Sequence, residues 1–392
     1  MNRNIPKEMT CWQAFSYIKP GQNFRGSLTL NKTKVVPPLK YPNQVLIKVK
    51  SAALNPIDSA QLRGYGSTAF HTASNLINNL HDPARNIISE LPITPGRDFF
   101  GEVISLGQTV DKNRLKIGDL VLGSTLPFMS SLDGGSLANY LVTPDCQVLK
   151  VLDRIKEKHF DFVSIPYAGL TAWAALEDSG SIKISDNKNN QTKKQILIPG
   201  STGLVGFIAV QLAKFSNAFT KIDTVISNNP KAELIIRQLK EAGFIDKVYT
   251  ADNVKDCTDK YDLIIDCVRR TSRDDEENIL KLVNENGRFV SLNSSLLKSQ
   301  DQQGLLPGSV FACLDLIQRN ISMNRFNPVD PGYVWGFYRP QMNRLEMLMK
   351  WYSEGEMKIL PIKVMNFEEA DQGLDIMDTK GEYEKIVINM ES

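Results

Sequence analysis

The sequence predicts an α/β protein that contains two kinds of sheet, and two observations support this. Short strand-like segments punctuated by glycine occupy the first part of the chain: VLIKVKSAAL (45–54), GEVISLG (101–107), GDLVLGS (118–124) and LANYLVTP (137–144). From about residue 165, short apolar runs alternate instead with helical stretches. The first pattern is typical of an antiparallel, barrel-like β domain, and the second of a parallel sheet covered on both faces by helices.

The second part of the chain is divided into strands and helices by its apolar periodicity. The expected strands are ILIPG (196–200), TVIS (224–227), LIIDCV (263–268) and RFVSL (288–292). The clearest helices are 205–215, 233–243 and, near the end, 343–356, after which the tail predicts strand, helix and strand. The insertion 66–92 shows no strand alternation, so it is either a lid or binding loop or a solvent-exposed decoration.

Composition excludes several classes of function. A chain of 392 residues predicts two or three domains. Its net charge of +2 does not indicate the strongly basic surface that is typical of proteins that bind nucleic acid. Five scattered cysteines without a CxxC pair favour a reducing compartment over a disulfide framework. No apolar run approaches the roughly 20 residues that span a bilayer, and we expect no membrane span. The start, MNRNIPKEM, lacks the features of a signal or transit peptide, which favours the cytoplasm.

The strongest single motif is the turn Gly200-Ser-Thr-Gly203-Leu-Val-Gly206 between a buried strand and a helix. Glycines at such a turn allow the backbone to approach a pyrophosphate, and the helix N-terminus supplies free N–H groups. The spacing is GxxGxxG, and a turn of this kind can also serve geometry alone. With a strand before it, a helix after it and a second strand following, we interpret it as a dinucleotide site.

The end of the second strand indicates which dinucleotide binds. An NAD site places an acidic residue there to hold the ribose 2′-hydroxyl. Here the segment reads Ser227-Asn228-Asn229-Pro230-Lys231 and contains no acid. A hydroxyl and a lysine suit a 2′-phosphate, so the sequence favours NADPH, although Lys231 can equally be a solvated residue of a first helical turn.

Taken together, these segments resemble the zinc-free medium-chain dehydrogenases/reductases of the quinone oxidoreductase type. The resemblance covers nearly the whole chain and is greatest for the branch of reticulon-4-interacting, mitochondrial NADPH oxidoreductases. The segments that carry it are YPNQVLIKVKSAALNPID (41–58), RGYG (63–66), LPITPGRDFFGEV (91–103), KIGDLVLG (116–123), SIPYAGLTAW (164–173), ILIPGSTGLVG (196–206), LIIDCV (263–268) and GYVWGFYRP (332–340).

The resemblance implies a fold, a reaction and a set of site residues. It implies a GroES-like catalytic domain from residues 1–164 and 329–392, a Rossmann domain from 165–328, and NADPH-dependent hydride transfer to a small-molecule quinone or enone. Homodimers are common in the family. The implied cofactor-binding residues are Thr171, Gly200, Thr202, Gly203, Leu204, Val205, Ser227, Lys231, Cys267, Leu292, Gly336 and Tyr338.

The implied catalytic residues are Asn55, Tyr65 and Asp98. Tyr65 or Asn55 could donate a hydrogen bond to the oxygen that becomes anionic as a quinone is reduced. The structural alternative is that Asn55 caps the turn before Pro56 and that Tyr65 only packs. Thr171 could face the nicotinamide or could instead be the hydroxyl of a helix start.

The segment PGRDFFGE (95–102) stands where zinc-containing relatives carry Gly-His-Glu. The three histidines, His71, His81 and His159, have no ligand spacing, so we expect no metal. Asp98 could be a general acid. The favoured interpretation is structural: Arg97 and Asp98 hold the turn by pairing with Asp58 and nearby groups, while the phenylalanines that follow pack inward.

Four departures from the family pattern bear on activity. Leu204 replaces a glycine of the phosphate turn, Ala251 replaces a tyrosine beside the adenine, Arg269-Arg270 replace Gly-Gly, and Tyr383-Glu384 replace Arg-Gly. They favour a second hypothesis, a non-catalytic NADPH-binding scaffold. A third is a 2-enoyl or alkenal reductase. For the compartment, resemblance favours mitochondria, whereas the N-terminus favours the cytoplasm.

Overall fold

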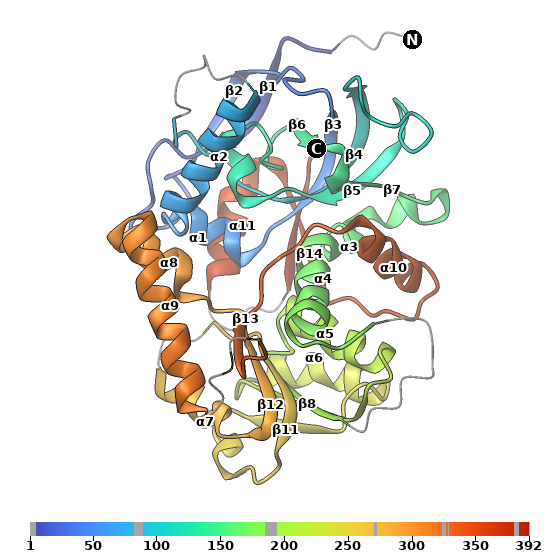
Figure 1. Ribbon diagram of the computed structural model, residues 1–392. Coiled ribbons are helices and arrows are strands. Elements are labelled where there is room, and N and C mark those ends of the chain that lie inside the picture. The colour runs from blue at the N-terminus through green and yellow to red at the C-terminus, as the bar shows by residue number, and fades with distance from the viewer. Residues whose placement is uncertain are drawn as a thin grey trace.

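The computed structural model describes residues 5–81, 89–184, 194–269, 273–323, 327, 329–379 and 384–391. Two domains lie one above the other, each built around its own sheet (Figure 1). Both ends of the chain lie in the upper one, the β domain. The lower one is the Rossmann domain. The predicted α/β fold class is therefore confirmed.

The β domain contains a seven-stranded sheet centred on β3 (Gln44–Ala53). Its order is β14-β15-β3-β4-β5-β7, and β6 also pairs with β3. All its pairs are antiparallel except β14 with β15, and β1 pairs with β2 in a separate ribbon. The bounds are β1 (Glu8–Gln13), β2 (Thr29–Val35), β4 (Asp98–Leu106), β5 (Leu120–Ser124), β6 (Tyr140–Pro144), β7 (Val148–Lys150), β14 (Ile362–Asn366) and β15 (Lys385–Asn389).

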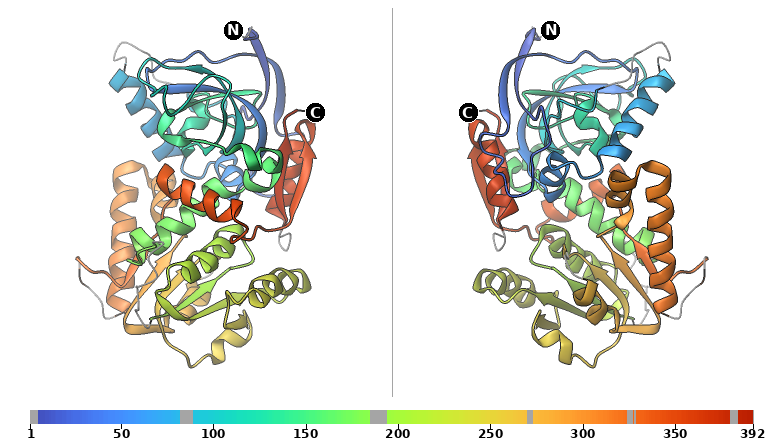
Figure 2. Two further views of the ribbon diagram at one scale, coloured as in Figure 1. Left: turned by 90° about the vertical axis from the view of Figure 1, so that its right-hand side faces the viewer. Right: turned by 90° about the vertical axis from the view of Figure 1, so that its left-hand side faces the viewer.

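The end of the chain completes this first sheet. β15 pairs with β3 so that Val387 lies opposite Ala53, which brings residues more than 300 positions apart into register. Figure 2 shows the C-terminal segment returning from the Rossmann domain to the side of the β domain. The strand–helix–strand pattern expected of the tail is present as β14, α11 (Ala370–Asp378) and β15.

The Rossmann domain is a six-stranded, all-parallel sheet in the order β10-β9-β8-β11-β12-β13. This is the doubly wound order, in which the direction of winding reverses beside the first strand and leaves a crevice at the carboxyl ends. The bounds are β8 (Lys194–Pro199), β9 (Phe219–Ile226), β10 (Lys247–Thr250), β11 (Tyr261–Asp266), β12 (Val283–Ser291) and β13 (Tyr333–Trp335). The last strand lies after residue 328, so the segment expected to return to the β domain first adds an edge strand here.

Helices cover the Rossmann sheet and connect the two domains. The helix predicted at 205–215 is α5 (Leu204–Phe215), whose buried face continues the core of β8 and β9. The remaining helices are α1 (Pro56–Leu62), α2 (Ser67–His81), α3 (His159–Phe162), α4 (Ile165–Ala174), α6 (Pro230–Glu241), α7 (Arg273–Leu280), α8 (Ser295–Gln303), α9 (Leu305–Ser322) and α10 (Met342–Ser353). In the described part of the chain, none of these helices combines the length and the apolar character that a bilayer span requires.

Most of the insertion 66–92 forms the helix α2, and residues 82–88 lie outside the described residues. α2 contacts α8 of the Rossmann domain and the 3₁₀ turn Pro127–Ser131 of its own domain. Figures 1 and 2 both place α2 directly above α8 and α9. The insertion is therefore a bridge between the domains.

Candidate functional site

The glycine-rich turn has three glycines with different structural roles. Gly200 follows β8 with φ of +85°, the left-handed region that favours glycine. A Cβ on Gly206 would lie 2.4 Å from the carbonyl oxygen of Gly200, so a glycine is required there for α5 to approach the sheet. Gly203 stands at the N-cap of α5, and a Cβ there would meet only the Gly200 oxygen, at 3.5 Å. The space beside Gly203 is therefore open to a ligand.

A cavity of about 420 Å³ opens from this turn along the carboxyl ends of the parallel strands. Five predicted cofactor residues line it, and the rest of the lining comes from the ends of β9 to β11, from the 3₁₀ turn Asn253–Asp256 and from α7. The lining residues are Gly200, Thr202, Gly203, Val225, Ile226, Ser227, Ala251, Val254, Lys255, Cys267, Val268, Asp275, Asn278 and Ile279. A crevice of this size at the topological switch point suits the adenosine half of a dinucleotide.

The predicted residues Leu204, Val205 and Lys231 lie beside the cavity. Leu204 and Val205 are the first two residues of α5 and pack against the core. Lys231 is in the first turn of α6, where its backbone N–H donates to Asn229 Oδ1 at 2.9 Å and its side chain is exposed. Lys255, which sequence reasoning did not select, is the cation that lines the cavity together with Ser227.

An acidic residue lies closer to this region than the sequence suggests. Asp252, at the end of the neighbouring strand β10, accepts a hydrogen bond from the side chain of Asn228. The missing acid in the segment 227–231 was the main argument for NADPH. Because a parallel sheet brings the ends of adjacent strands together, an acid from β10 can stand where one from β9 is absent.

Three tyrosines meet where the β domain faces the carboxyl edge of the Rossmann sheet. The ring of Tyr167 on α4 stacks on that of Tyr338 with centroids 4.7 Å apart, and Tyr338 Oη donates to the carbonyl of Ser124 at 3.2 Å. Tyr65, in the turn between α1 and α2, lies within electrostatic range of Tyr167. Thr171 is one turn after Tyr167, is buried, and donates to its carbonyl at 2.7 Å.

Burial and neighbouring charges keep these phenols protonated. Burial raises the pKa of Tyr167 to about 12, although Arg97 opposes the rise. Burial also raises the pKa of Tyr338. For Tyr65, burial and then the carboxylate of Asp301 raise the pKa, while Arg269 lowers it. All three therefore carry the hydroxyl proton of a hydrogen-bond donor at neutral pH.

Asn55 and Asp98 are joined in a buried network that ends at Lys385. Lys385 Nζ donates to Asn55 Oδ1 at 2.7 Å. Asn55 Nδ2 in turn donates to Asp98 Oδ2 at 2.8 Å and to the carbonyl of Ala53 at 3.3 Å. The second oxygen of Asp98 accepts from the backbone N–H of Tyr167 at 2.9 Å. Both amide hydrogens of Asn55 are thus directed to protein acceptors, and the network fixes the start of α4 against the β domain.

Asn55 is also the N-cap of α1, and its backbone N–H donates to Asp58 Oδ2 at 2.8 Å. The structural alternative considered for Asn55, a cap before Pro56, is thus present together with its contact to Asp98. Arg97 Nε lies 3.3 Å from Asp58 Oδ1, and Arg97 Nη2 donates to Gln61 Oε1 at 2.6 Å. The predicted pairing of Arg97 with Asp58 is confirmed. The inward packing of Phe99 and Phe100 is confirmed as well, since both are buried.

The charges of this network are strongly perturbed by burial. Burial raises the pKa of Asp98 to about 7, and the positive charge of Lys385 limits the rise. Burial also raises the pKa of Asp58 against the effect of Arg97. It lowers the pKa of Lys385, which Asp98 and Asp58 partly offset. Asp98 therefore exchanges a proton near neutral pH, as a general acid or a pH-sensitive structural group would.

The chemistry of these donors is unfavourable for a metal. The network around Asp58 and Asp98 contains the cations Arg97 and Lys385, and both would repel a dication. Within the described residues, no three His, Cys, Asp or Glu side chains form a group that could hold a metal ion. His159 packs against the ring of Phe100 instead, with centroids 4.8 Å apart, and accepts or donates a hydrogen bond with Ser51 Oγ at 2.9 Å.

The remaining predicted residues, Leu292 and Gly336, lie at the carboxyl ends of the neighbouring strands β12 and β13. Gly336 follows β13, and its N–H donates to the carbonyl of Ser291 at 2.9 Å. A Cβ on Gly336 would lie 2.8 Å from the side chain of Leu292, so the two residues are in close contact. Arg269 and Glu384, two of the departures from the family pattern, are exposed, whereas Arg270 and Tyr383 lie outside the described residues.

Sequence reasoning missed several residues of this site. Lys385 follows directly after Glu384, and its position next to a departure from the family pattern was the available signal. Gln61 and Asp301 gave no signal, because each acts through a contact with a distant part of the chain. Lys255 lies on a short 3₁₀ turn (Asn253–Asp256) whose position follows only from the packing of β9 and β10.

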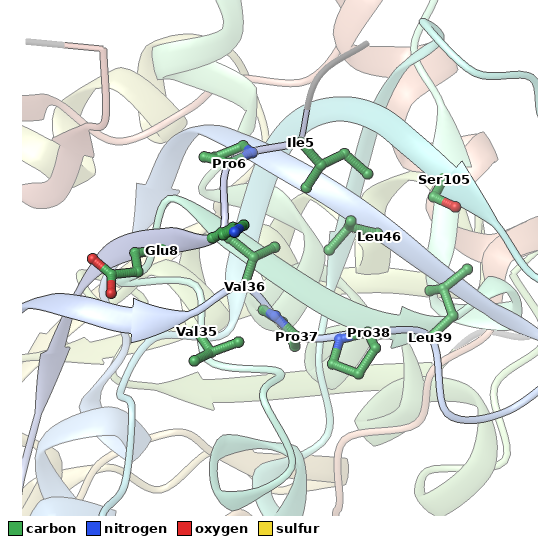
Figure 3. Close-up of a pocket in the computed structure, with 11 residues that line it drawn as sticks. Ile5, Pro6, Glu8, Val35, Val36, Pro37, Pro38, Leu39, Leu46 and Ser105 are labelled. Carbon is green, nitrogen blue, oxygen red and sulfur yellow. The ribbon is translucent and has the colours of Figure 1, made fainter. Parts of the chain in front are cut away.

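A second cavity, of about 670 Å³, lies on the β domain between the β1–β2 ribbon and the sheet (Figure 3). Its apolar lining includes Ile5, Val35, Val36, Leu39 and Leu46. Leu46 is near the start of β3, whereas Asn55 follows the end of that strand, so this cavity is separate from the network described above.

The chain matches known proteins along most of its length. Residues 41–153 match the alcohol dehydrogenase GroES-like domain, and residues 242–388 match the zinc-binding dehydrogenase domain. The protein named "NAD(P)H oxidoreductase RTN4IP1, mitochondrial" from Danio rerio is 28% identical over 384 residues, covering 97% of this chain and 92% of the relative. "NADPH-dependent alkenal/one oxidoreductase, chloroplastic" from Arabidopsis thaliana is 32% identical over 297 residues, covering 75% of this chain and 64% of the relative.

The fold is shared with solved structures as well. The quinone oxidoreductase from Coxiella burnetii superposes with a TM-score of 0.68 at 24% identity, covering 98% of this chain and all of that one. The CurK enoyl reductase superposes with a TM-score of 0.65 at 18% identity, covering 98% of this chain and 99% of that one. At these identities the likeness establishes the fold. With the two domain matches and the full-length relatives, it shows that the chain belongs to the medium-chain dehydrogenase/reductase family.

Proposed function

We propose that the protein is an NADPH-dependent oxidoreductase that reduces quinones or related conjugated carbonyl compounds without a metal. One observation carries the proposal: the cavity that begins at Gly203 and Tyr338, whose ring stacks on that of Tyr167, both follow the carboxyl ends of strands of the Rossmann sheet. Members of the family named as NAD(P)H or NADPH oxidoreductases support it.

The residues present fit a dinucleotide. The open space beside Gly203 and the N-terminus of α5 would hold the pyrophosphate, and the cavity would hold the adenosine. Ser227 and Lys255 would contact a 2′-phosphate. When bound, NADPH supplies a hydride to the acceptor.

On the acceptor side, the chain would supply hydrogen bonds and position. Reduction of a conjugated carbonyl places negative charge on its oxygen, and a donor aimed at that oxygen stabilises the charge. We assign this role to the hydroxyl of Tyr65, which its surroundings keep protonated. Asn55 and Asp98 would act indirectly, by positioning Tyr167. Asn55 donates to Asp98, and Asp98 accepts a hydrogen bond from the backbone N–H of Tyr167.

The test is NADPH oxidation with a panel of quinones and enones. We expect turnover with at least one of these classes, and the Tyr65→Phe variant should lower kcat about a hundredfold, as loss of an oxyanion donor does. Tyr352→Phe on α10, whose hydroxyl contacts Asp161, is the matched control and should change kcat less than about twofold. Unchanged turnover in Tyr65→Phe would remove that residue from the mechanism.

The same panel separates two alternatives. Preference for enones over quinones would indicate an alkenal reductase, the activity named for the Arabidopsis relative. NADPH binding without turnover of either class would indicate a scaffold protein, which the exposed Arg269 and Glu384 in place of glycines favour. Metal analysis of the purified protein checks the metal-free mechanism, and one bound zinc per chain would contradict it.

The choice between NADPH and NADH depends on which residue contacts the adenosine ribose. Lys255 would bind the 2′-phosphate of NADPH, whereas Asp252 would bind the 2′-hydroxyl of NADH. A contact between a lysine and a 2′-phosphate is charge-assisted, so Lys255→Ala should raise the KM for NADPH about tenfold and leave that for NADH within about twofold. Lys231→Ala is the comparison for the exposed cation at the start of α6. If NADH is the better substrate of the unaltered protein, Asp252 acts as the acid of an NAD site.

The proposed compartment is the mitochondrion, on the strength of relatives whose names place them there. Fractionation of cells that express the full-length protein tests this. Recovery in the cytosol alone would contradict it.

A further inference from the structure

Asp301, on α8 of the Rossmann domain, is bonded to the turn of the β domain that follows Tyr65. Its Oδ2 accepts from the backbone N–H of Gly66 at 2.6 Å. Its Oδ1 accepts from the backbone N–H of Thr68 at 3.1 Å and from Ser67 Oγ at 3.3 Å. One carboxylate thus forms three hydrogen bonds across the boundary between the domains.

The carboxylate supplies a cap that the sequence around α2 does not. The first N–H groups of a helix have no partner within it, and a side chain just before the helix usually accepts from them. Before Ser67 the chain reads Gly64-Tyr65-Gly66, in which no side chain is a good capping acceptor. An acid from the other domain takes that place, and its negative charge suits the positive end of the 15-residue helix.

The turn that carries Tyr65 is therefore fixed from both domains. The backbone N–H of Tyr65 donates to the carbonyl of Ala60 on α1 at 3.0 Å. Gly66, the next residue, adopts φ of +76° and is held by Asp301. Loss of the Asp301 contacts would free the turn on one side, directly beside the tyrosine.

We propose that Asp301 is a positioning residue that fixes Tyr65 at the site from the opposite domain, so that the hydroxyl is placed only when the two domains are docked. This inference rests on the function proposed for Tyr65. It assigns to the insertion 66–92 a role in catalysis, because the helix capped by Asp301 begins within it.

Electrostatics supports the geometry. Burial raises the pKa of Tyr65, and two charged groups act on the same phenol: Asp301 disfavours its ionisation and Arg269 favours it. The carboxylate that positions the turn thus also helps to keep the hydroxyl of Tyr65 protonated.

The kinetic test compares Asp301→Ala and Asp301→Asn with a control on the same helix, Gln302→Ala, whose side chain is exposed. Displacement of a reacting group by about 1 Å costs on the order of a hundredfold, so we expect kcat to fall about ten- to a hundredfold in Asp301→Ala. The KM for NADPH should stay within about twofold, because neither Asp301 nor residues 66–68 line the cofactor cavity. Asp301→Asn keeps one acceptor and should lose less.

The second test needs no turnover. Absorbance titration of the phenols, with Tyr65→Phe subtracted to isolate Tyr65, should give a lower pKa for Tyr65 in Asp301→Asn than in the unaltered protein. If the unaltered protein reduces no acceptor, the proposed function fails, and this titration still tests the contact. Circular dichroism confirms that each variant is folded, and should Asp301→Ala unfold, Asp301→Asn provides both measurements.

Three outcomes would overturn the inference. One is a kcat in folded Asp301→Ala and Asp301→Asn equal to that in Gln302→Ala. Another is a Tyr65 titration that is the same in Asp301→Asn and in the unaltered protein. A rise in the KM for NADPH with unchanged kcat would also contradict it, because it would place Asp301 with the cofactor.

Discussion

Arg97 and Asp98 are adjacent in sequence, yet they belong to different pairs. Arg97 binds Asp58 and Gln61, while Asp98 binds Asn55 and the start of α4. Successive residues at the beginning of a strand point to opposite sides, which explains the separation. With Lys385, the region holds two acids and two bases, and burial of this many charges is tolerated because each has a partner of opposite sign or a hydrogen bond.

Asp98 should make stability depend on pH. Its pKa rises from 3.8 unfolded to about 7 folded, so between these values the folded protein binds the extra proton. Stability from this group is therefore present at low pH and is lost as pH rises toward 7, by up to about 1.4 kcal/mol per pH unit. The free energy of unfolding of the unaltered protein, compared with Asp98→Asn by urea titration from pH 4.5 to 8, should show this slope below pH 7 and none above.

The matched control is Asp256→Asn, a substitution of an exposed acid. Its urea titrations should run parallel to those of the unaltered protein at every pH. Parallel curves for Asp98→Asn as well would contradict the role given to burial.

The Arg97–Asp58 pair should be costly to break. Both side chains are at least 98% buried, and Asp58→Asn would leave the guanidinium without its counter-ion. We expect the free energy of unfolding to fall by about 3 kcal/mol or more. Asp378→Asn, which breaks the partly exposed pair with Arg63, should cost less than about 1 kcal/mol. Equal losses in the two variants, measured by urea unfolding, would show that burial does not set the cost.

At the scale of elements, two glycines of the turn after β8 have different roles: Gly203 leaves room for a ligand, and Gly206 allows the turn to pack. A Cβ on Gly203 would make only an ordinary contact with the Gly200 oxygen, at 3.5 Å, whereas one on Gly206 would lie 2.4 Å from that atom. Gly203→Ala should therefore fold normally and raise the Kd for NADPH about tenfold by obstructing the pyrophosphate. Gly206→Ala should instead lower the melting temperature by several degrees. Calorimetry of binding and of unfolding checks both, and weaker binding by the Gly206 variant alone would reverse the assignment.

The elements themselves could be predicted from sequence because their signals are local. The apolar runs at 196–200 and 263–268 and the glycines between 200 and 206 lie within single strand–helix units, and the structure has β8, β11 and α5 there. Asp301 capping α2 joins residues about 235 positions apart, and Lys385 bonds Asn55 across 330. The first contact exists only after the two domains dock, and the second only after β15 has paired with β3, so neither pairing is visible in a local pattern.

At the scale of the whole molecule, α9 exposes an apolar face. Its buried side carries Gly308, Ala312 and Asn320, while the opposite side presents large apolar residues at intervals of three and four. These are Leu306, Val310, Phe311, Leu314, Ile317 and Ile321, and the first of them is 76% exposed. A contiguous stripe of this kind usually marks an interface. The neighbouring strand β13 is at the edge of the sheet, and Asn320 on the buried side of α9 covers this edge by bonding the backbone N–H and carbonyl of Tyr333 at 2.9 and 3.0 Å.

We expect a second copy of this chain to cover the face, because a two-fold axis beside α9 would bring two such apolar faces together in one closed interface. Leu314→Glu would place charges of like sign in that interface and should convert the dimer to a monomer, with little change in the unfolding of each domain. Leu234→Glu on α6, which removes an isolated exposed leucine, is the control and should leave the dimer intact. Light scattering coupled to size-exclusion chromatography measures both masses, and a monomeric mass for the unaltered protein would show that the α9 face binds something other than a second copy.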